Sequence, residues 1–355
     1  MATNRVVLVE DSPVALEILQ RLLNSSPDVD VVGTARDGVE GLEVITRTRP
    51  DVICTDFMME SMDGLELTKR VMAEDPRPIL VISNFVQKVD VDNVFRLLQA
   101  GAADVFPKPS TDSPTDYERL KAALVTKIKV LSNMKVTAKR PGQSLSTPGK
   151  PITSGAFSGN QPLMTNVSSR LKVIAIGGST GGLQSIQKIL AQLPTNFPLP
   201  IICTVHASQG ILSGMVNWLS SECGLRVKIA EVGESPSPGT VYFSPEKNNL
   251  ELDSRGKFIY TPCPEADKHC PCISVTFNSI AKFYGKATAG VLLTGIGRDG
   301  AQGLQAIAQA GGITVAQEDK GGAAFGMVKE AMNLSAVQQV LGIDKIAPYL
   351  LKTIS

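Results

Sequence analysis

The sequence of 355 residues contains only two histidines, His206 and His269. A reaction that needs a general base near neutral pH therefore has few candidate residues. No apolar run reaches the roughly 20 residues that a membrane-spanning helix needs, so no membrane insertion is expected. The first residues lack the apolar region and cleavage site of a secretory signal, which predicts a cytoplasmic protein.

Neither sign of charge dominates, because 35 Lys and Arg oppose 34 Asp and Glu, for a formal net charge of +1. This balance gives no reason to expect nucleic acid as a partner. Cysteine is also sparse, with six residues, and in a cytoplasmic protein we expect thiols rather than disulfides. Hydrophobic residues make up 43% of the chain, and its length suits two ordinary domains and a linker.

The first half alternates short apolar runs with amphipathic stretches. The runs are short and rich in β-branched residues, as in buried parallel strands. They are Val6–Val9, Val29–Gly33, Val52–Cys54, Ile79–Ile82 and Ala103–Phe106. Helices are expected at Val14–Leu23, Gly38–Thr46, Gly64–Met72, Val91–Ala100 and about Tyr117 to Met134. The alternation predicts a doubly wound α/β domain, with helices on both faces of a parallel sheet, over residues 1–134.

Residues 135–170 are rich in Pro, Gly, Ser and Thr and have little apolar periodicity. Such a segment buries too little surface to offset its ordering entropy, so we expect a flexible linker; an ordered functional loop is the alternative.

The strand-helix alternation resumes at Leu171 and predicts a second doubly wound α/β domain over residues 171–355. Its expected strands are Lys172–Ile176, Ile201–Val205, Thr240–Phe243, Ala289–Leu293 and Ile313–Ala316. Its expected helices are Gly182–Leu193, Gly214–Ser221, Ile273–Tyr284, Gly300–Gln309 and Phe325–Met332.

Polar side chains follow the predicted strands of the first half. Glu10 and Asp11 follow the first strand, Asp56 the third, Ser83 ends the fourth, and Lys108 follows the fifth. In an open parallel sheet these strand ends form the ligand site. Three converging carboxylates would bind a hard cation such as Mg²⁺ and keep Asp56 nucleophilic. Lys108 and Ser83 could then contact a phosphoryl group on Asp56; the alternative is a set of unrelated loop residues.

This set resembles the receiver domain of bacterial response regulators over about residues 4–125. The matching motifs are Glu10-Asp11-Ser12, Cys54-Thr55-Asp56-Phe57-Met58-Met59, Met62-Asp63-Gly64, Ser83 and Phe106-Pro107-Lys108-Pro109. The resemblance implies a flavodoxin-like fold, phosphorylation of Asp56, Mg²⁺ held by Glu10, Asp11 and Asp56, and a sensor histidine kinase as phosphodonor. The sequence departs from the pattern at Val105, where receivers often carry an aromatic switch residue.

A serine flanked by glycines follows the first predicted strand of the second half, in Gly177-Gly178-Ser179-Thr180-Gly181-Gly182. Ser179 fits the Gly-x-Ser-x-Gly spacing of a nucleophile at a sharp strand-helix turn. The N-terminus of the following helix would favour developing negative charge. Nucleotide binding is the competing interpretation, but the glycines do not fit G-x-G-x-x-G and no Gly-Lys-Ser/Thr follows.

A serine nucleophile needs a base and a group that orients the base. His206 ends the next predicted strand, and Asp299 follows the strand Ala289–Leu293. Strand ends of a parallel sheet meet at one edge, which favours a Ser179–His206–Asp299 triad. Asp299 as a simple helix N-cap remains the alternative.

Residues from about 171 to 350 resemble the catalytic domain of the chemotaxis protein-glutamate methylesterases, the CheB family. The match lies at Ile176–Gly182, His206, Leu292–Gly300, Ala316-Gln317-Glu318 and Phe325-Gly326-Met327. It implies a Rossmann-like three-layer domain that demethylates chemoreceptor signalling helices without a cofactor and deamidates their glutamines. It also implies that Ser179 is the nucleophile, His206 the base, Asp299 its orienting carboxylate and the Ile296 N–H an oxyanion donor. Ala207-Ser208 and Val328-Lys329 depart from the family's Met-Pro and Pro-Arg.

Alternatives stay open for the cysteine-rich segment and for the function of the second half. Zinc could be held by Cys263, His269, Cys270 and Cys272, but their spacing is not a standard ligand set. The other interpretations of this segment are a reduced loop and a redox pair at Cys270 and Cys272. The second half could be a non-catalytic binding module, or an esterase outside chemotaxis. The architecture further predicts that the unphosphorylated receiver restrains the esterase.

Overall fold

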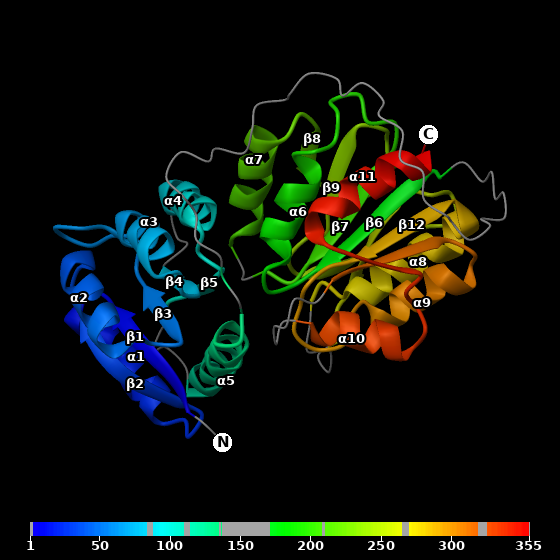
Figure 1. Ribbon diagram of the computed structural model, residues 1–355. Coiled ribbons are helices and arrows are strands. Elements are labelled where there is room, and N and C mark those ends of the chain that lie inside the picture. Colours follow the sequence, from blue (N-terminus) through cyan, green and yellow to red (C-terminus); the bar gives the residue numbers. More distant parts are fainter. Residues whose placement is uncertain are drawn as a thin grey trace, which may run out of the picture.

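The computed structural model describes residues 3–83, 88–109, 114–134, 136, 171–207, 210–264, 270–318 and 325–354. These residues form two α/β domains that lie side by side, the first coloured blue to teal and the second green to red (Figure 1). The expected linker falls outside the described residues except for Val136, and so does His269.

The N-terminal domain contains a parallel sheet with the order β2-β1-β3-β4-β5. Its strands are β1 (Asn4–Val9), β2 (Val29–Ala35), β3 (Val52–Thr55), β4 (Ile79–Ser83) and β5 (Asp104–Pro107). Its helices are α1 (Pro13–Asn24), α2 (Gly38–Thr48), α3 (Gly64–Glu74), α4 (Lys88–Ala100) and α5 (Pro114–Leu131).

Helices cover both faces of this sheet because alternate strand residues point to opposite faces. Val6 and Leu8 pack in a core with Leu22 of α1 and Ile128 of α5. On the other face, Val7, Val9 and Ile53 pack with side chains of α2, α3 and α4. The predicted doubly wound α/β domain is confirmed.

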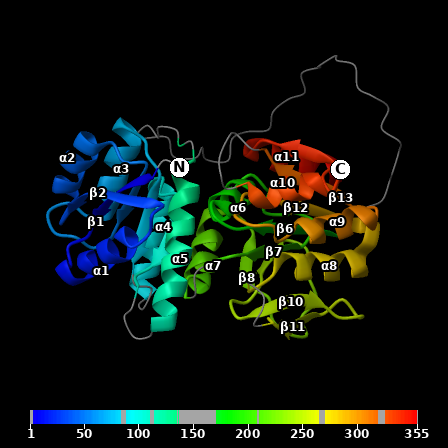
Figure 2. The same cartoon turned by 90° about the horizontal axis from the view of Figure 1, so that it is seen from below.

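The C-terminal domain contains a seven-stranded sheet with the order β14-β13-β12-β6-β7-β9-β8, in which all pairs are parallel. Its strands are β6 (Val173–Gly178), β7 (Ile201–Val205), β8 (Arg226–Ile229), β9 (Thr240–Phe243), β12 (Thr288–Leu292), β13 (Ile313–Gln317) and β14 (Gln339–Leu341). A separate antiparallel hairpin joins β10 (Asn248–Leu252) to β11 (Phe258–Pro262) and packs beside α8 (Figure 2).

Helices again cover both faces, which gives the expected three layers. The helices are α6 (Gly182–Leu190), α7 (Leu212–Glu222), α8 (Ile273–Tyr284), η1 (Gly285–Ala287), α9 (Ala301–Gln309), α10 (Gly326–Asn333) and α11 (Ile343–Ile354). Side chains of α6, α7 and α11 share one core cluster, and those of α8, α9 and α10 share the other. No helix of the described residues is long and apolar enough to span a bilayer.

The two domains meet through α4 and α7 (Figures 1 and 2). The Phe95 ring stacks on Trp218 with ring centroids 5.0 Å apart, and both side chains are buried. The Gln99 amide donates to Glu222 at 2.7 Å, and the Gln184 amide donates to the carbonyls of Ala102 and Ala103, each at 2.9 Å. The edge of the N-terminal domain formed by α4 and β5 therefore lies against the C-terminal domain.

Candidate active site and phosphorylation site

Ser179 lies in a tight turn between β6 and α6. Gly181 adopts a φ of 73°, a left-handed conformation that glycine accepts without a steric cost. The Ser179 N–H donates to the Thr294 carbonyl at 2.9 Å, and the Gly182 N–H donates to the Ser179 carbonyl at 2.7 Å. The turn thus holds the serine at the carboxyl edge of the sheet, where the sequence predicts it.

The loop after β12 approaches this turn closely. A Cβ atom on Gly295 would lie 2.0 Å from the Met327 sulfur and 2.8 Å from Ser179 Cβ, so this position needs glycine. The Thr294 hydroxyl donates to the Thr180 carbonyl at 2.8 Å and ties the two loops together. Thr294 was not predicted, because its role depends on contacts between distant segments. Among the described hydrogen bonds, none uses the N–H of Ile296, the residue predicted to stabilise an oxyanion.

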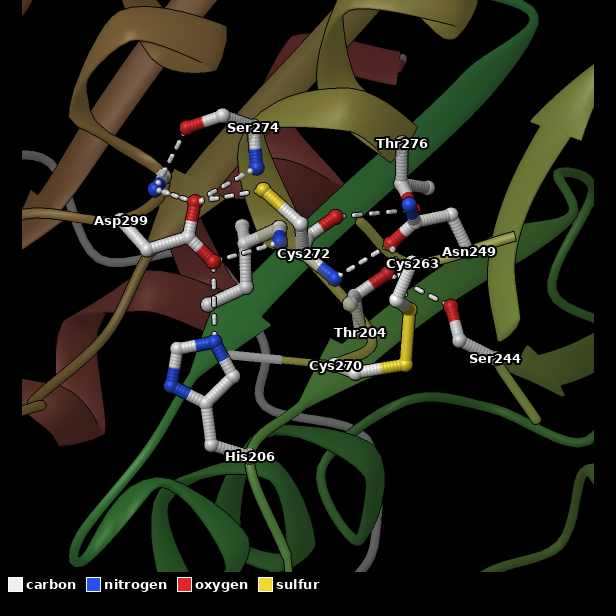
Figure 3. A network of polar contacts seen from close by, with 12 residues as sticks. Thr204, His206, Ser244, Asn249, Cys263, Cys270, Cys272, Ser274, Thr276 and Asp299 are labelled. Atoms are coloured by element: carbon white, nitrogen blue, oxygen red, sulfur yellow. Dashed lines mark hydrogen bonds and ion pairs between the residues drawn. A yellow bond between two sulfur atoms is a disulfide. The ribbon is translucent and has the colours of Figure 1, made fainter. Parts of the chain in front are cut away.

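His206 follows β7 and lies beside the nucleophile turn. Its backbone N–H donates to the Gly178 carbonyl at 3.1 Å. The Nε2 atom of its ring lies 2.9 Å from Oδ2 of Asp299 (Figure 3). The structure therefore pairs the predicted base with the predicted orienting carboxylate, although 93 residues separate them in the chain.

Asp299 lies at the N-terminus of α8, where several donors surround its carboxylate (Figure 3). Its Oδ2 accepts the Ile273 N–H at 2.7 Å, and its Oδ1 accepts the N–H groups of Ser274 at 2.9 Å and Gly300 at 2.7 Å. The Cys272 thiol lies 3.2 Å from Oδ1. Burial opposes ionisation, but the hydrogen bonds and charge of His206 and the backbone donors outweigh it, so the pKa of Asp299 lies below its usual value.

The start of α8 is a part of the site that the sequence analysis missed. The place of Asp299 after a predicted strand points to this residue, but no local pattern in the sequence indicates that Cys272, Ile273 and Ser274 hold it. Backbone N–H groups at a helix start often donate to the side chain of an N-cap Asp. Here the helix is α8, which precedes Asp299 in the sequence, and not α9, which follows it.

Ser179 and His206 line the same cavity, which has a volume of about 40 Å³. Four residues of the N-terminal domain form part of its wall, namely Leu98, Asp104, Val105 and Lys127. The Lys127 ammonium lies 2.6 Å from the Asp104 carboxylate. A water needs about 10–15 Å³ of such space, so the cavity has room for water beside Ser179 and His206.

The predicted acidic site in the receiver is assembled as expected. Oxygen atoms of Glu10, Asp11 and Asp56 lie within 4.8 Å of one another. Oε2 of Glu10 is buried, and the described residues offer it no hydrogen-bond partner. A buried carboxylate oxygen without a donor, in a group of three carboxylates, fits a hard divalent cation such as Mg²⁺.

Lys108 lies directly after β5 and contacts this group. Its ammonium is 2.8 Å from Glu10 and 2.5 Å from Asp56. Burial raises the pKa of both carboxyl groups, and the nearby ammonium only partly offsets it. The buried Ser83 ends β4, and its carbonyl accepts the Lys108 N–H at 3.2 Å. The phosphate-contacting residues predicted from sequence thus lie on neighbouring strands.

The cysteine prediction was wrong for two of the six residues. Cys263 and Cys270 form a disulfide, whereas Cys54, Cys203, Cys223 and Cys272 are free. The alternative pair at Cys270 and Cys272 is also wrong, because Cys270 bonds to Cys263. The rule that cytoplasmic proteins avoid disulfides concerns the compartment and does not take account of which sulfur atoms the fold brings together.

Two family models match the chain, one in each domain. The CheB methylesterase family model matches residues 174–350, and the response regulator receiver domain model matches residues 6–118. The protein-glutamate methylesterase/protein-glutamine glutaminase 1 of Syntrophus aciditrophicus is 38% identical over 348 residues, 98% of this chain and 97% of the relative.

Another relative and a solved structure are similar to the chain. The protein-glutamate methylesterase/protein-glutamine glutaminase of Nitrosospira multiformis is 35% identical over 97% of this chain and 95% of its own length. The CheB methylesterase catalytic domain of Thermotoga maritima is 33% identical and covers 52% of this chain and 98% of its own, with a TM-score of 0.49. With both family models matched in this order and relatives aligned over nearly its whole length, the chain belongs to the CheB methylesterase family and carries a response regulator receiver domain.

Proposed function

We propose that this protein is a protein-glutamate methylesterase, which removes methyl groups from glutamate methyl esters of chemoreceptor signalling helices, and also a protein-glutamine glutaminase. The observation that carries the proposal is the shared cavity of Ser179 and His206, with His206 hydrogen-bonded to Asp299. Relatives similar over the whole chain bear the names of both activities. Because these receptor segments and the phosphodonor kinase are cytoplasmic in such pathways, we place the enzyme there too.

The reaction follows from the roles of three side chains. Ser179 Oγ attacks the ester carbonyl, and His206 accepts its proton. The Asp299 carboxylate is hydrogen-bonded to Nε2 of the imidazole, so the other ring nitrogen, Nδ1, takes and returns protons. His206 then protonates the departing methanol, which leaves an acyl-enzyme on Ser179. Water activated by the same histidine releases the glutamate carboxylate; with a glutamine substrate, ammonia leaves in place of methanol.

Negative charge on the substrate oxygen needs donors near Ser179. The N–H of Ser179 is already used by the Thr294 carbonyl, so it is not one of them. We assign the N–H of Ile296 as a donor, since it lies in the loop held against Ser179 by Gly295 and Thr294. The N–H groups at the start of α6, the helix that follows Ser179, add to the stabilisation of this negative charge.

Asp56 is the phosphorylation site in this proposal, with a sensor histidine kinase as phosphodonor. Its carboxylate attacks the phosphoryl group, while Lys108 would move its contacts from the carboxylates to the phosphoryl oxygens. Glu10, Asp11 and Asp56 would hold Mg²⁺, which when bound neutralises charge in the site. The Ser83 hydroxyl would donate to the phosphoryl group.

Phosphorylation would act on the esterase through β5. Lys108 adjoins Asp56, and Val105, three residues earlier, lines the cavity that contains Ser179 and His206. A change at Lys108 can therefore move the receiver wall of the active-site cavity. Because receiver residues form part of the wall around Ser179 and His206, we infer that the closed arrangement is restrained and that phosphorylation favours an open one.

Methanol release from methylated receptor membranes tests the function directly. The intact protein should release methanol, treatment with a small-molecule phosphodonor and Mg²⁺ should increase the rate, and Ser179→Ala should release none above background. Binding to the membranes without methanol release would instead identify a non-catalytic module. Methanol release from other methylated proteins but not from receptors would place the same chemistry outside chemotaxis.

A further inference from the structure

A disulfide lies close to the carboxylate that orients the base. Cys263 follows β11, and Cys270 lies two residues before Cys272, the N-cap of α8. Figure 3 shows the disulfide, Cys272 and Asp299 in one polar network. The disulfide therefore joins the end of the β10–β11 hairpin to the segment that begins α8.

Asn249 connects the disulfide to the helix start. This residue of β10 is 2% exposed, and its side-chain oxygen accepts the Cys272 N–H at 2.7 Å. The same oxygen lies 3.6 Å from the Cys263 sulfur, and its amide nitrogen donates to the Pro262 carbonyl at 3.5 Å. The position of Cys272 thus depends on an amide packed against the disulfide.

The helix start in turn fixes Asp299. The N–H groups of Ile273 and Ser274 and the thiol of Cys272 all point to its carboxylate. The Asp299 carboxylate is in turn hydrogen-bonded to Nε2 of His206 and fixes the orientation of the imidazole ring. A continuous series of contacts leads from the Cys263–Cys270 bond to the imidazole, within one small region of the domain (Figure 3).

We propose that Cys263 and Cys270 are a redox modification site, at which an external dithiol opens the disulfide and thereby lowers esterase activity by loosening the support of Asp299. This inference rests on the proposed function. One thiolate of the dithiol attacks a disulfide sulfur and forms a mixed disulfide, and its second thiol displaces the protein sulfur. Two electrons pass from the dithiol to the protein, which ends with thiols at Cys263 and Cys270, and the dithiol ends as a disulfide.

Cys272 takes no part in the exchange. Burial and the charge of Asp299 raise the pKa of its thiol to about 11, so little thiolate exists near neutral pH. It remains a protonated donor to Asp299, and the redox chemistry stays with the other two sulfur atoms. The disulfide can then open and close without a competing attack by the nearest free thiol.

The effect should appear in kcat. Because the contacts lead to the catalytic base and not to the substrate-binding wall, the reduced enzyme should show a kcat lower by about tenfold with KM nearly unchanged. If the disulfide only stabilised the domain, its reduction would lower the melting temperature and leave kcat of the folded protein unchanged.

The test uses the full chain, receptor membranes and dithiothreitol. Protein prepared without reductant should contain four alkylatable thiols under denaturing conditions and six after reduction. Methanol release, measured well below the melting temperature of each form, should fall as the thiol number rises and recover on reoxidation. Cys263→Ser and Cys270→Ser should have the low kcat in both conditions, while Cys223→Ser, a half-buried thiol outside this region, should respond as the wild type does.

Equal kcat for the oxidised and reduced wild type, with thiol numbers of four and six confirmed, would overturn the proposal. Six alkylatable thiols in protein kept from reductant would overturn it as well. If the oxidised wild type released no methanol at all, the proposed esterase function would fail instead, so the two outcomes are distinguishable.

Discussion

The Phe95 ring of the receiver stacks on the Trp218 indole of the catalytic domain, with an interplanar angle of 13°. The contact lies between α4 and α7, next to the cavity that contains Ser179 and His206. It buries an aromatic side chain from each domain, and aromatic pairs contribute about 0.5–1.5 kcal/mol beyond their area. The stack is therefore a main contact of the restrained arrangement.

Removal of this contact should raise the activity of the unphosphorylated protein. We expect Phe95→Ala to increase methanol release by about two- to tenfold, as the lost stacking shifts the domains toward the open arrangement. Phe283→Ala, at an exposed ring of α8, is the matched control and should leave the rate unchanged. A fragment beginning near residue 168 should also be faster than the untreated intact protein; a slower fragment would mean that the receiver is a required activator.

Loss of the nucleophile should abolish turnover without unfolding the protein. For Ser179→Ala we expect a fall in kcat on the order of a million-fold, as for other triad serines. Ser254→Ala, in an exposed turn, should retain wild-type activity. Thermal melting of all three proteins checks the fold. Activity of Ser179→Ala within about tenfold of wild type would contradict the assignment.

The two histidines allow a direct test of the base. His206→Gln should be inactive to a similar degree, because the imidazole is the proton carrier in both half-reactions. His269→Gln should retain most activity. Methanol release and circular dichroism measure both effects, and equal losses in the two variants would point to a structural or metal-binding role of His269.

Asp299 should matter for activity and for acid stability. Asp299→Asn should lower kcat on the order of 10⁴-fold, since the imidazole loses its orienting carboxylate. Because the pKa of Asp299 is lower in the folded protein than in the unfolded chain, the ionised side chain stabilises the fold at pH values above the unfolded-state pKa of about 3.9. This contribution is lost as pH falls toward the folded-state pKa. Urea unfolding should therefore show the variant less stable than wild type at pH 7, with a smaller difference at pH 3.

The phosphorylation site should be specific to one carboxylate. A small-molecule phosphodonor with Mg²⁺ should label the wild type with about one base-labile phosphate per chain. Acid-stable label should not exceed background, and Asp56→Asn should take up no phosphate. Chelation of Mg²⁺ should prevent labelling if, as we propose, Glu10, Asp11 and Asp56 hold the cation. Label that persists in Asp56→Asn would show that another residue is the acceptor.

Most of the fold could be predicted because parallel strands buried on both faces are continuous apolar runs. The runs at Val6–Val9 and Ile201–Val205 are strands in the structure, and the polar residues at strand ends are where the site residues lie. The proposed site residues Ser179, His206 and Asp56 were selected in this way, because carboxyl ends of parallel strands share an edge.

Elements with a weak local pattern were not predicted. The edge strand β14 has three residues, and α11 contains Pro348, which argues against a helix interior in a sequence. The hairpin β10–β11 has partly exposed strands and depends on packing against α8. The contacts of Cys272 and Asn249 with the site come from residues brought together only by the fold, so no local pattern reports them.

The shared wall of the catalytic cavity makes the nucleophile a reporter of domain opening. Leu98 and Val105 of the receiver line the cavity that contains Ser179, so a fluorophosphonate that reacts with active serines should label the open arrangement faster than the closed one. Its labelling rate would then measure the fraction of open molecules without any receptor substrate. In a mixed population, the labelled enzyme would mark the molecules whose receiver has been phosphorylated, so a stain for the serine becomes an indirect measure of signalling.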